Sequence, residues 1–510
     1  MKRSLALFLA LVVLFTSIPF GVLAKSDRVK NIRKIDRVAT EPDMGAEKRP
    51  EAPIEKDATI DREEASASAQ KPESLPQMAM MRTPAQRETI EINSKDDFLK
   101  LWNKEELYSG FGPSSYQPGT GYDKGDAWHH GVKNKDIVLN VDIEVSSDEI
   151  NAPISKNEHD PIHNFGFGMD SCTFNGNNHT ITVTKGTREI YPLFGDIKSA
   201  YNNETSRDIK DLNIVYKGDV MGSAFARNIL SSNSTSPNVD YKISNIKVDV
   251  GGSILPYVTL IPAKQSLGRE DLPKENYSGF PRFDTETFAV GMAYLLDSAQ
   301  IDGYTLNVKG NIGSPEVKKH EFAKTDLVHA KSSGLFIRKN WYNFKVFAGV
   351  KNVNINVDGG IYAHSQNFRA EAFGIGDDVQ NKRYDKLDIN VKGDIEAKAT
   401  GTIVFTKNYS YGHEPSLAAG FARDLHQLEN SKINVGGSIR SINETDIDMD
   451  TTAAGIGLFD YINNHKGPND SDLTDENSLE KHPQTVKNVE VTVGGDIYAE
   501  STKAPRYKKD

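Results

Sequence analysis

The chain of 510 residues contains a single cysteine, Cys172, so no intramolecular disulfide can form. Stability must come from a noncovalent core, and we expect Cys172 to be a small buried apolar residue rather than a reactive thiol. Basic residues are too few for a nucleic-acid partner, because 61 Lys and Arg stand against 71 Asp and Glu, a net charge of −10 at pH 7. Contacts to phosphates have little support in such a chain.

The chain also lacks the common catalytic and metal-binding motifs. No Gly-rich phosphate loop, zinc-type Cys pair, H-E-x-x-H or G-x-S-x-G occurs. The nearest histidine groups are His129–His130 and His159–His163, and Pro161 prevents a regular helix in the second. Polar loops are the simpler interpretation of both, so we assign no catalytic residue, cofactor site or metal ligand.

Two acidic segments leave a calcium site as an open alternative. Asn469–Glu476 resembles the start of an oxygen-ligand loop but lacks the Gly that an EF-hand places at its sixth position. Asp446–Asp450 alternates Asp on one face of an extended segment. Solvated loops explain both patterns more simply, and no cofactor is assigned.

Long apolar runs are absent except near the N-terminus. Two basic residues precede the apolar stretch Leu5–Ile18, and Val22–Ala24 fits a small-residue cleavage site, which together make a secretory signal. An uncleaved membrane anchor is disfavoured because the run is short and is interrupted by Pro19 and Gly21. We predict a signal peptide over 1–24, no stable membrane span after its cleavage, and a secreted or cell-surface location.

Aromatic residues are absent between Phe20 and Phe98. This stretch is rich in Glu, Lys, Ala, Pro and Ser and has no sustained hydrophobic period. Such a segment cannot bury enough apolar surface to offset the entropy lost on ordering. We therefore predict that 25–88 is a disordered linker or pro-segment.

A repeat fills much of the remaining chain. The pattern V-x-G-x-I, preceded by alternating apolar residues, ends at positions 254, 312, 361, 395, 439 and 497, and a looser copy spans Asp211–Val220. In the first of these, Ile246, Val248 and Val250 lie two apart, which is typical of a strand with one buried face. Self-similarity of this kind predicts a repeat architecture.

Each repeat carries a glycine and a second apolar segment. We expect the glycine to mark a bulge, a bend or a close backbone approach, one for each solenoid corner. These structural glycines are Gly218, Gly252, Gly310, Gly359, Gly393, Gly437 and Gly495. The second segment is small and apolar, as in Phe288–Leu296 and Leu417–Leu425, and we interpret it as a second inward strand. A buried helix is the alternative, since the periodicity of a short apolar run does not distinguish a strand from a helix.

The first folded elements differ from the repeats. Ser94–Asp97 has the pattern of a capping box, and Phe98, Leu101 and Trp102 fall on one helical face, which predicts a helix that caps the first coil. Asp136–Val145 alternates as one strand. Cys172–Val183 places apolar residues on both sides of an Asn-Gly turn.

This order of elements resembles bacterial surface proteins with a right-handed parallel β-helix of the GLUG-motif, pectate-lyase-like kind. The matching stretches are VLNVDIEV, FNGNNHTITV, PLFGDI and IKDLNIVYKGDV, and the AAGFA-type copies resemble the Gly-rich phrase of that motif. The resemblance covers roughly Ile90 to Glu500, although FNGNNHTI lacks the family's usual Asp-Gly-Asn-Gly. It implies a secreted or wall-associated protein, often the outer part of an adhesin-like molecule, and no particular ligand.

We therefore predict an all-β fold, a right-handed parallel β-helix (β-solenoid) over 89–502, with an N-terminal capping helix and a disordered N-terminal region. Residues 503–510 are expected to be a tail or the start of a continuing chain. The expected function is an adhesin-like binding module or stalk, a monomer that contacts a host or neighbouring-cell protein or glycan.

Aromatic residues in two insertions are the candidate ligand-binding residues, because exposed aromatics often anchor partners. They are Tyr277, Phe280, Phe283, Trp341 and Tyr342, and packing within their own loops is the alternative role. Two other functions stay open. One is a carbohydrate-active β-helix enzyme, a polysaccharide lyase or glycoside hydrolase, although the outward position after each repeat glycine never carries consecutive Asp for a stacked carboxylate pair. The other is a purely structural spacer in a larger surface protein.

Overall fold

The computed structural model describes residues 87–103, 131–150, 166–198, 207–230, 241–262, 283–296, 299–316, 327–338, 348–366, 369–378, 382–401, 416–424, 427–445, 451–458 and 485–502. The chain divides into two compact units, Met1–Met81 and Arg82–Asp510, and all described residues belong to the second. The predicted signal peptide, nearly all of the predicted linker, and residues 503–510 lie outside the described residues.

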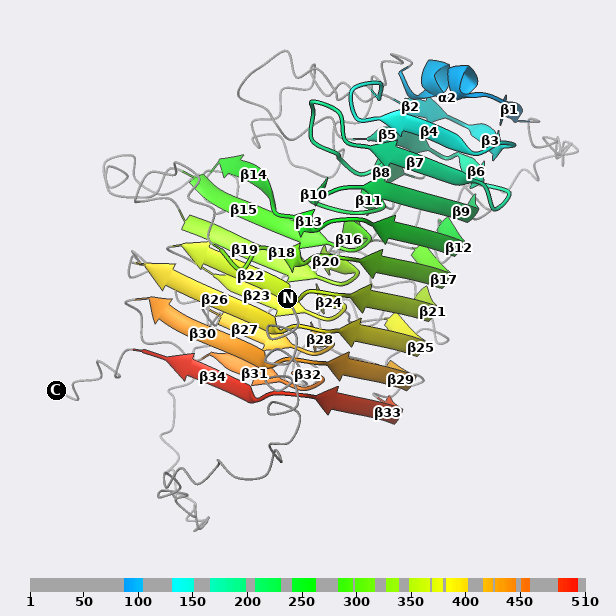
Figure 1. Ribbon diagram of the computed structural model, residues 1–510. Coiled ribbons are helices and arrows are strands. Elements are labelled where there is room, and N and C mark those ends of the chain that lie inside the picture. Colours follow the sequence, from blue (N-terminus) through cyan, green and yellow to red (C-terminus); the bar gives the residue numbers. More distant parts are fainter. Residues whose placement is uncertain are drawn as a thin grey trace, which may run out of the picture. The chain divides into compact units, whose positions relative to one another are not determined.

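The described part of the second unit is a parallel β-helix of four sheets, which we call A to D (Figure 1). Sheet A contains β1 (Glu88–Ile92), β3 (Lys135–Leu139), β4 (Ile143–Ser146), β6 (Thr173–Asn175), β7 (Thr180–Thr184), β9 (Arg207–Lys217), β12 (Tyr241–Val250), β17 (Ala299–Val308), β21 (Ala348–Val357), β25 (Lys382–Val391), β29 (Gln427–Val435) and β33 (Thr485–Val493). Sheet B contains β2 (Gly131–Lys133), β5 (Phe167–Asp170), β8 (Phe194–Lys198), β11 (Ala226–Leu230), β16 (Ala293–Leu296), β20 (Phe336–Arg338), β24 (Gly376–Asp378), β28 (Ala422–Asp424) and β32 (Gly457–Leu458).

The other two sheets are shorter. Sheet C contains β10 (Val220–Met221), β13 (Ile254–Leu255), β18 (Ile312–Gly313), β22 (Ile361–Gln366), β26 (Ile395–Gly401), β30 (Ile439–Thr445) and β34 (Ile497–Ser501). Sheet D contains β14 (Tyr257–Pro262), β15 (Phe283–Val290), β19 (Leu327–Ser333), β23 (Ala370–Phe373), β27 (Ser416–Ala419) and β31 (Thr452–Ala454). Its β14 and β15 pair in antiparallel fashion, unlike the parallel pairs of the repeats.

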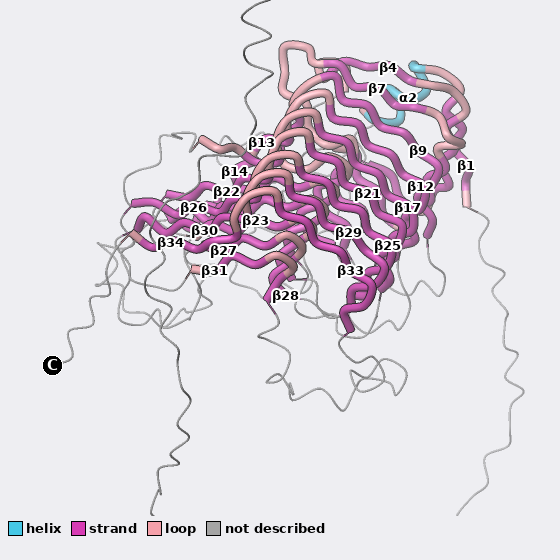
Figure 2. The backbone as a smooth tube through the Cα atoms, turned by 60° about the horizontal axis from the view of Figure 1, so that its bottom comes forward, coloured by secondary structure: helices cyan, strands magenta, loops and turns pink. Residues whose placement is uncertain are grey.

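One coil of the repeat passes through the sheets in the order A, C, D, B. Along the chain β25, β26, β27 and β28 follow one another, and β29 then pairs in parallel with β25 as the next coil begins. Figure 2 shows the coils stacked, with strand above strand in each sheet. The predicted all-β solenoid is confirmed.

Sheets A and B enclose the main hydrophobic core. The alternating residues predicted to face inward do so, because Ile246, Val248 and Val250 are each at most 2 % exposed. Aromatic side chains in and beside sheet B fill the other side, and the ring of Phe421, which directly precedes β28, lies 5.2 Å from that of Tyr384 of sheet A. Complete burial of each aliphatic side chain contributes about 1.5–3 kcal/mol.

Sheets C and D pack face to face through small side chains. Ala397 and Ala399 of β26 are fully buried, as are Ala370 and Ala372 of β23. A buried hydroxyl pair also joins the two sheets, Ser416 Oγ to Ser441 Oγ at 2.8 Å. Small side chains let the two sheets approach more closely than sheets A and B do around their aliphatic core.

The second apolar segment of each repeat forms two short strands, one in sheet D and one in sheet B, rather than the single strand predicted. A glycine separates them, as Gly374 separates β23 from β24. The added Cβ of an alanine at Gly374 would lie 1.9 Å from the carbonyl oxygen of Gly420 in the next coil. A close turn therefore divides the segment, and the helix alternative is wrong for these strands.

The single strand predicted over Asp136–Val145 is also two strands, β3 and β4. The break has a counterpart in every later coil, where one residue of the long sheet A strand has a positive φ. These residues are Asp211, Asn245, Gly303, Asn352, Lys386, Asn430 and Asn488. Asparagine and glycine tolerate this left-handed conformation better than other residues. The bend lets sheet A turn a corner without losing register.

The repeat glycines occupy the corner between sheets A and C, as a close approach of neighbouring coils requires. A Cβ at Gly437 would lie 2.2 Å from Asp394 Oδ1 and 2.9 Å from the carbonyl carbon of Gly393. In five of the coils, the side chain after the glycine accepts a hydrogen bond from a backbone N–H of the next coil. Ser253 N donates to Asp219 Oδ1 at 2.7 Å, and Ser438 N donates to Asp394 Oδ1 at 2.7 Å. Figure 2 shows these turns as a column between sheets A and C.

The predicted capping helix is confirmed as α2 (Lys95–Trp102). Ser94 is its N-cap and accepts from Asp97 N at 3.1 Å. The buried residues of α2 include Trp102, whose ring stacks on Phe167 of β5 at 4.2 Å and whose Nε1 donates to Leu193 O. Cys172 is also buried as expected, and burial raises the pKa of its thiol to about 11.

Candidate functional site

The outer face of sheet C carries the candidate site. In β22, β26 and β30, alternate residues face sheet D, and the residues between them face outward. Register pairing places Tyr362, Glu396, Arg440 and Tyr498 in one row across four strands. Two charged residues therefore lie between two tyrosines, which are each half-buried.

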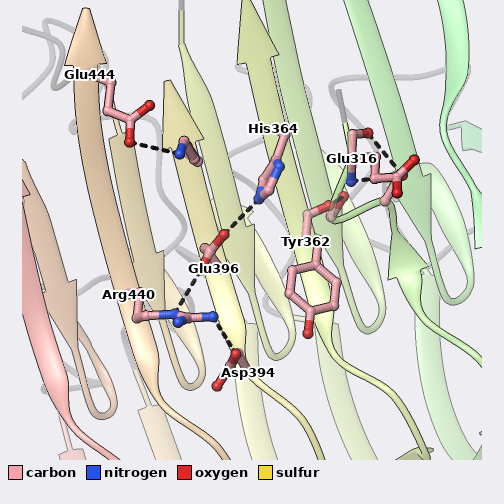
Figure 3. Close-up of polar contacts among 10 residues, drawn as sticks. Glu316, Tyr362, His364, Asp394, Glu396, Arg440 and Glu444 are labelled. Carbon is pink, nitrogen blue, oxygen red and sulfur yellow. Dashed lines mark hydrogen bonds and ion pairs between the residues drawn. The ribbon is translucent and has the colours of Figure 1, made fainter. Parts of the chain in front are cut away.

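Ion pairs connect this row to its neighbours (Figure 3). Glu396 accepts from His364 Nε2 at 2.8 Å through Oε1, and it pairs with Arg440 Nε at 2.7 Å through Oε2. The Arg440 Nη2 also binds Asp394 Oδ2, so the guanidinium bridges Glu396 of β26 and the residue directly before that strand. A second pair, Lys398 Nζ to Glu444 Oε1 at 2.7 Å, lies on the same face.

The network holds Glu396 and Arg440 in their charged forms. Burial raises the pKa of Glu396, but the hydrogen bond from His364 and the charge of Arg440 outweigh it, and the net pKa is lowered. Burial lowers the pKa of Arg440, but Glu396 and Asp394 outweigh it and raise the pKa overall. Glu396 therefore stays ionised at neutral pH, where it acts only as a hydrogen-bond acceptor.

The arrangement offers fixed donors, fixed acceptors and two aromatic rings on one rigid face. The side chains of Glu396 and His364 are about nine-tenths buried, whereas those of Asp394 and Arg440 are about one-quarter exposed. A ligand would therefore contact Arg440, Asp394 and the tyrosines and would leave the inner pair in place. Pre-organised polar groups of this kind lose little entropy on binding.

The aromatic residues predicted to bind ligand are not part of this site. Tyr277, Phe280, Trp341 and Tyr342 lie outside the described residues. Phe283 begins β15, where its backbone pairs with Pro262 of β14. The histidine groups at 129–130 and 159–163 and the acidic segments at 446–450 and 469–476 are also outside the described residues.

The positions beside each repeat glycine do not indicate this site. Asp394 is one of those positions, but Glu396, which shares Arg440 with it, lies two residues further along the chain. The available signal was the pattern Asp394-Ile395-Glu396, which puts two carboxylates on one face of a strand. The corresponding position in β30 is Arg440, and register pairing brings it beside them.

Within the described ranges, no group of three or more His, Cys, Asp or Glu side chains is arranged to hold a metal ion. No helix in the described part of the chain is long and apolar enough to cross a membrane. Comparison with known proteins gives no match to a family model, a curated protein or a solved structure.

Proposed function

We propose that this protein is an exported, cell-surface or secreted binding module, and that the outer face of sheet C contacts a glycan. The observation that carries the proposal is the row Tyr362–Glu396–Arg440–Tyr498, with its charges fixed by Asp394 and His364. The solenoid holds these residues on regular strands, so it acts as a rigid support for the binding face.

A glycan suits this face for two reasons. Sugar hydroxyls both donate and accept hydrogen bonds, and the face offers two carboxyl groups beside a guanidinium. Tyrosine presents an apolar ring with a polar tip, which suits the mixed surface of a sugar ring. With strands about 4.8 Å apart, the two tyrosines lie about 14 Å from one another, a span suited to a short oligosaccharide.

Binding is better supported than catalysis by the same residues. Hydrolysis of a glycosidic bond needs one carboxyl group with a raised pKa to act as general acid. The pKa of Glu396 is lowered, so Glu396 is not held in the acid form that this role needs, and Asp394 is engaged in an ion pair with Arg440. The extracellular location rests on the predicted signal peptide, and the resemblance to GLUG-motif surface proteins agrees with it.

Binding to an array of immobilised neutral and acidic oligosaccharides, followed by titration of each hit, tests the proposal. The variants Tyr362→Ala and Tyr498→Ala should each weaken binding by about tenfold, because each removes one ring contact worth roughly 1 kcal/mol or more. Lys432→Ala, on the outer face of sheet A, is the matched control and should bind as the wild type does.

Three results would count against the proposal. Unchanged affinity in both tyrosine variants, with circular dichroism as in the wild type, would remove the sheet C face as the binding surface. Release of new reducing ends or unsaturated sugars from any of the bound glycans, lost in Glu396→Gln, would favour the enzyme alternative instead. Binding to matrix proteins but to no glycan would show that the ligand is a protein and not a glycan.

A further inference from the structure

The last described coil of the repeat domain exposes apolar side chains that earlier coils bury. Val486 of β33 and Ile497, the first residue of β34, are 41 % and 47 % exposed. Their register partners one coil earlier, Leu428 and Ile439, are completely buried. The same positions of the repeat are therefore buried wherever another described coil follows and are exposed where none does.

The last described coil is also an edge of all four sheets. Among the described strands, β33, β34, β31 and β32 each pair with one neighbour only. The backbone N–H and C=O groups on the other side of an edge strand are a template for pairing with another chain. The opposite end of the stack differs, because the buried residues of α2 cover the first coils there (Figure 1).

The segment that leads into β33 is too polar to serve as a further apolar layer. Residues 463–484 contain two large apolar residues, Leu473 and Leu479, among many Asn, Asp, Glu and Lys. Such a composition buries little apolar surface. An exposed apolar edge is better matched by a partner that has an apolar edge of its own.

A second copy of the chain has that edge. Head-to-tail stacking of two copies is disfavoured because α2 covers the first coils, whereas a two-fold axis brings two last coils together in a closed dimer. With the axis perpendicular to sheet A, the core lies on the same side of the sheet in both copies. The two β33 strands then run antiparallel, and the inward side chains of both copies meet.

Side-chain alternation selects the register of this pairing. Centring the two strands on Val491 places Val491 opposite itself and Val489 opposite Val493, which are the inward, half-buried residues of β33. On the outer face Glu490 then lies opposite Thr492, so no like charges face one another. Centring on Glu490 would place two carboxylates directly opposite each other, which is destabilising.

We propose that two copies of this chain associate end to end through antiparallel pairing of β33 with β33 of the second copy. The pairing continues sheet A across the two-fold axis and covers the exposed end of the core between sheets A and B. A dimer replaces the monomer expected from the sequence. The pairing does not involve the outer face of sheet C, so the proposal does not depend on the glycan-binding function given above.

Sedimentation velocity of the full-length chain without its predicted signal peptide tests the proposal over a series of concentrations. The protein should be a dimer at high concentration and should dissociate to a monomer on dilution. Hydrogen exchange followed by mass spectrometry should show that the amides of β33 are protected in the dimer and exchange faster in the monomer. The amides of β25, in the middle of the stack, should stay protected in both.

Three results would overturn the proposal. The first is a monomer at every concentration that the solubility allows. The second is protection of β33 that does not change on dilution, which would show that another part of the same chain covers the edge. The third is a series of open-ended oligomers that grow with concentration, because a two-fold contact closes at the dimer.

Two variants at one position give tests of opposite sign. Thr492→Glu places a carboxylate opposite Glu490 of the second copy and should raise the dissociation constant several-fold, since each dimer contains two such pairs. Thr492→Lys places an ammonium group there and should lower the dissociation constant by a similar factor. Both changes are on the outer face of β33, so they leave the inward valines in place.

Thr305→Glu is the matched control. Thr305 lies on the outer face of β17, where β12 and β21 flank it on both sides, so the same chemical change there should leave the dissociation constant unaltered. Circular dichroism of all three variants should match that of the wild type. Equal dissociation constants for Thr492→Glu and Thr492→Lys would show that Glu490 of the second copy is not opposite this position, and the pairing of β33 would be wrong.

Discussion

Glycine serves one purpose at two corners of each coil, which is to let neighbouring backbones approach. At the corner between sheets D and B, Gly374 faces the carbonyl oxygen of Gly420 in the next coil. At the corner between sheets A and C, Gly437 faces Asp394 and the backbone of Gly393. Gly218 differs from these, because a Cβ there would only reach ordinary van der Waals contact, 3.6 Å from Ile190 Cδ1.

This difference predicts unequal effects for one chemical change. Gly374→Ala should lower the free energy of unfolding by about 1–3 kcal/mol, as overpacking does elsewhere. Gly218→Ala should leave it unchanged or raise it by about 0.4–1 kcal/mol, because alanine reduces the entropy of the unfolded chain. Denaturant unfolding of the two variants beside the wild type provides the measurement. Similar losses of stability in both variants would mean that the close approach of neighbouring coils does not determine where glycine is required.

Prediction from the sequence succeeds for individual core residues and fails for the charged cluster on sheet C. The inward positions of Ile246, Val248 and Val250 follow from period two alone, whatever the length of the loops. The Asp394–Arg440–Glu396–His364 cluster does not, because its members come from three coils separated by insertions of unequal length. The charge at any one position indicates nothing about its neighbour until the register between coils is known.

At the scale of strands, the choice of side-chain size sets the spacing of the sheets. Alternating Val, Ile and Leu of sheet A face aromatic residues of sheet B across a wide core. Alanine and serine fill the space between sheets C and D, where Ser332 Oγ donates to the backbone carbonyl of Tyr362 at 2.7 Å. Alternation predicted these strands, and the repeat glycines predicted the corner between sheets A and C. The left-handed residue within each sheet A strand and the glycine that divides the second apolar segment were not predicted, because a bend of one residue hardly disturbs the pattern.

A larger side chain between sheets C and D should therefore be costly. Ala372 is fully buried and pairs in register with Ser332 and Ala418. Ala372→Leu should lower the free energy of unfolding by about 1–3 kcal/mol, because the two sheets cannot separate without breaking their shared hydrogen bonds. Ile389→Leu in the wide core conserves volume and should cost less than about 1.5 kcal/mol. Equal stability of the Ala372 variant and the wild type would show that the interface between sheets C and D accommodates a larger side chain.

At the scale of the whole repeat domain, each coil packs mainly on the coils before and after it. Sheet A pairs β9 with β12, β12 with β17, and onward to β33 in chain order. The stability of such an array is approximately a sum of terms from neighbouring repeats. The first coils need a different cover, which the buried Phe98, Leu101 and Trp102 of α2 provide. Removing these contacts should therefore lower the stability of the first coils more than that of the later ones.

Trp102→Ala tests this locality. The indole stacks on Phe98 and Phe167, each at 4.2 Å, and bonds Leu193 O, so its removal should cost about 3–5 kcal/mol of local stability. Hydrogen exchange followed by mass spectrometry should show lost protection in β1 to β8 and little change in β25 to β30. Ser94→Ala, which removes only the N-cap oxygen, should affect the same strands by about 1 kcal/mol. Uniform loss of protection along every coil would instead mean that the domain unfolds as one cooperative unit, and the nearest-neighbour account of its stability would be wrong.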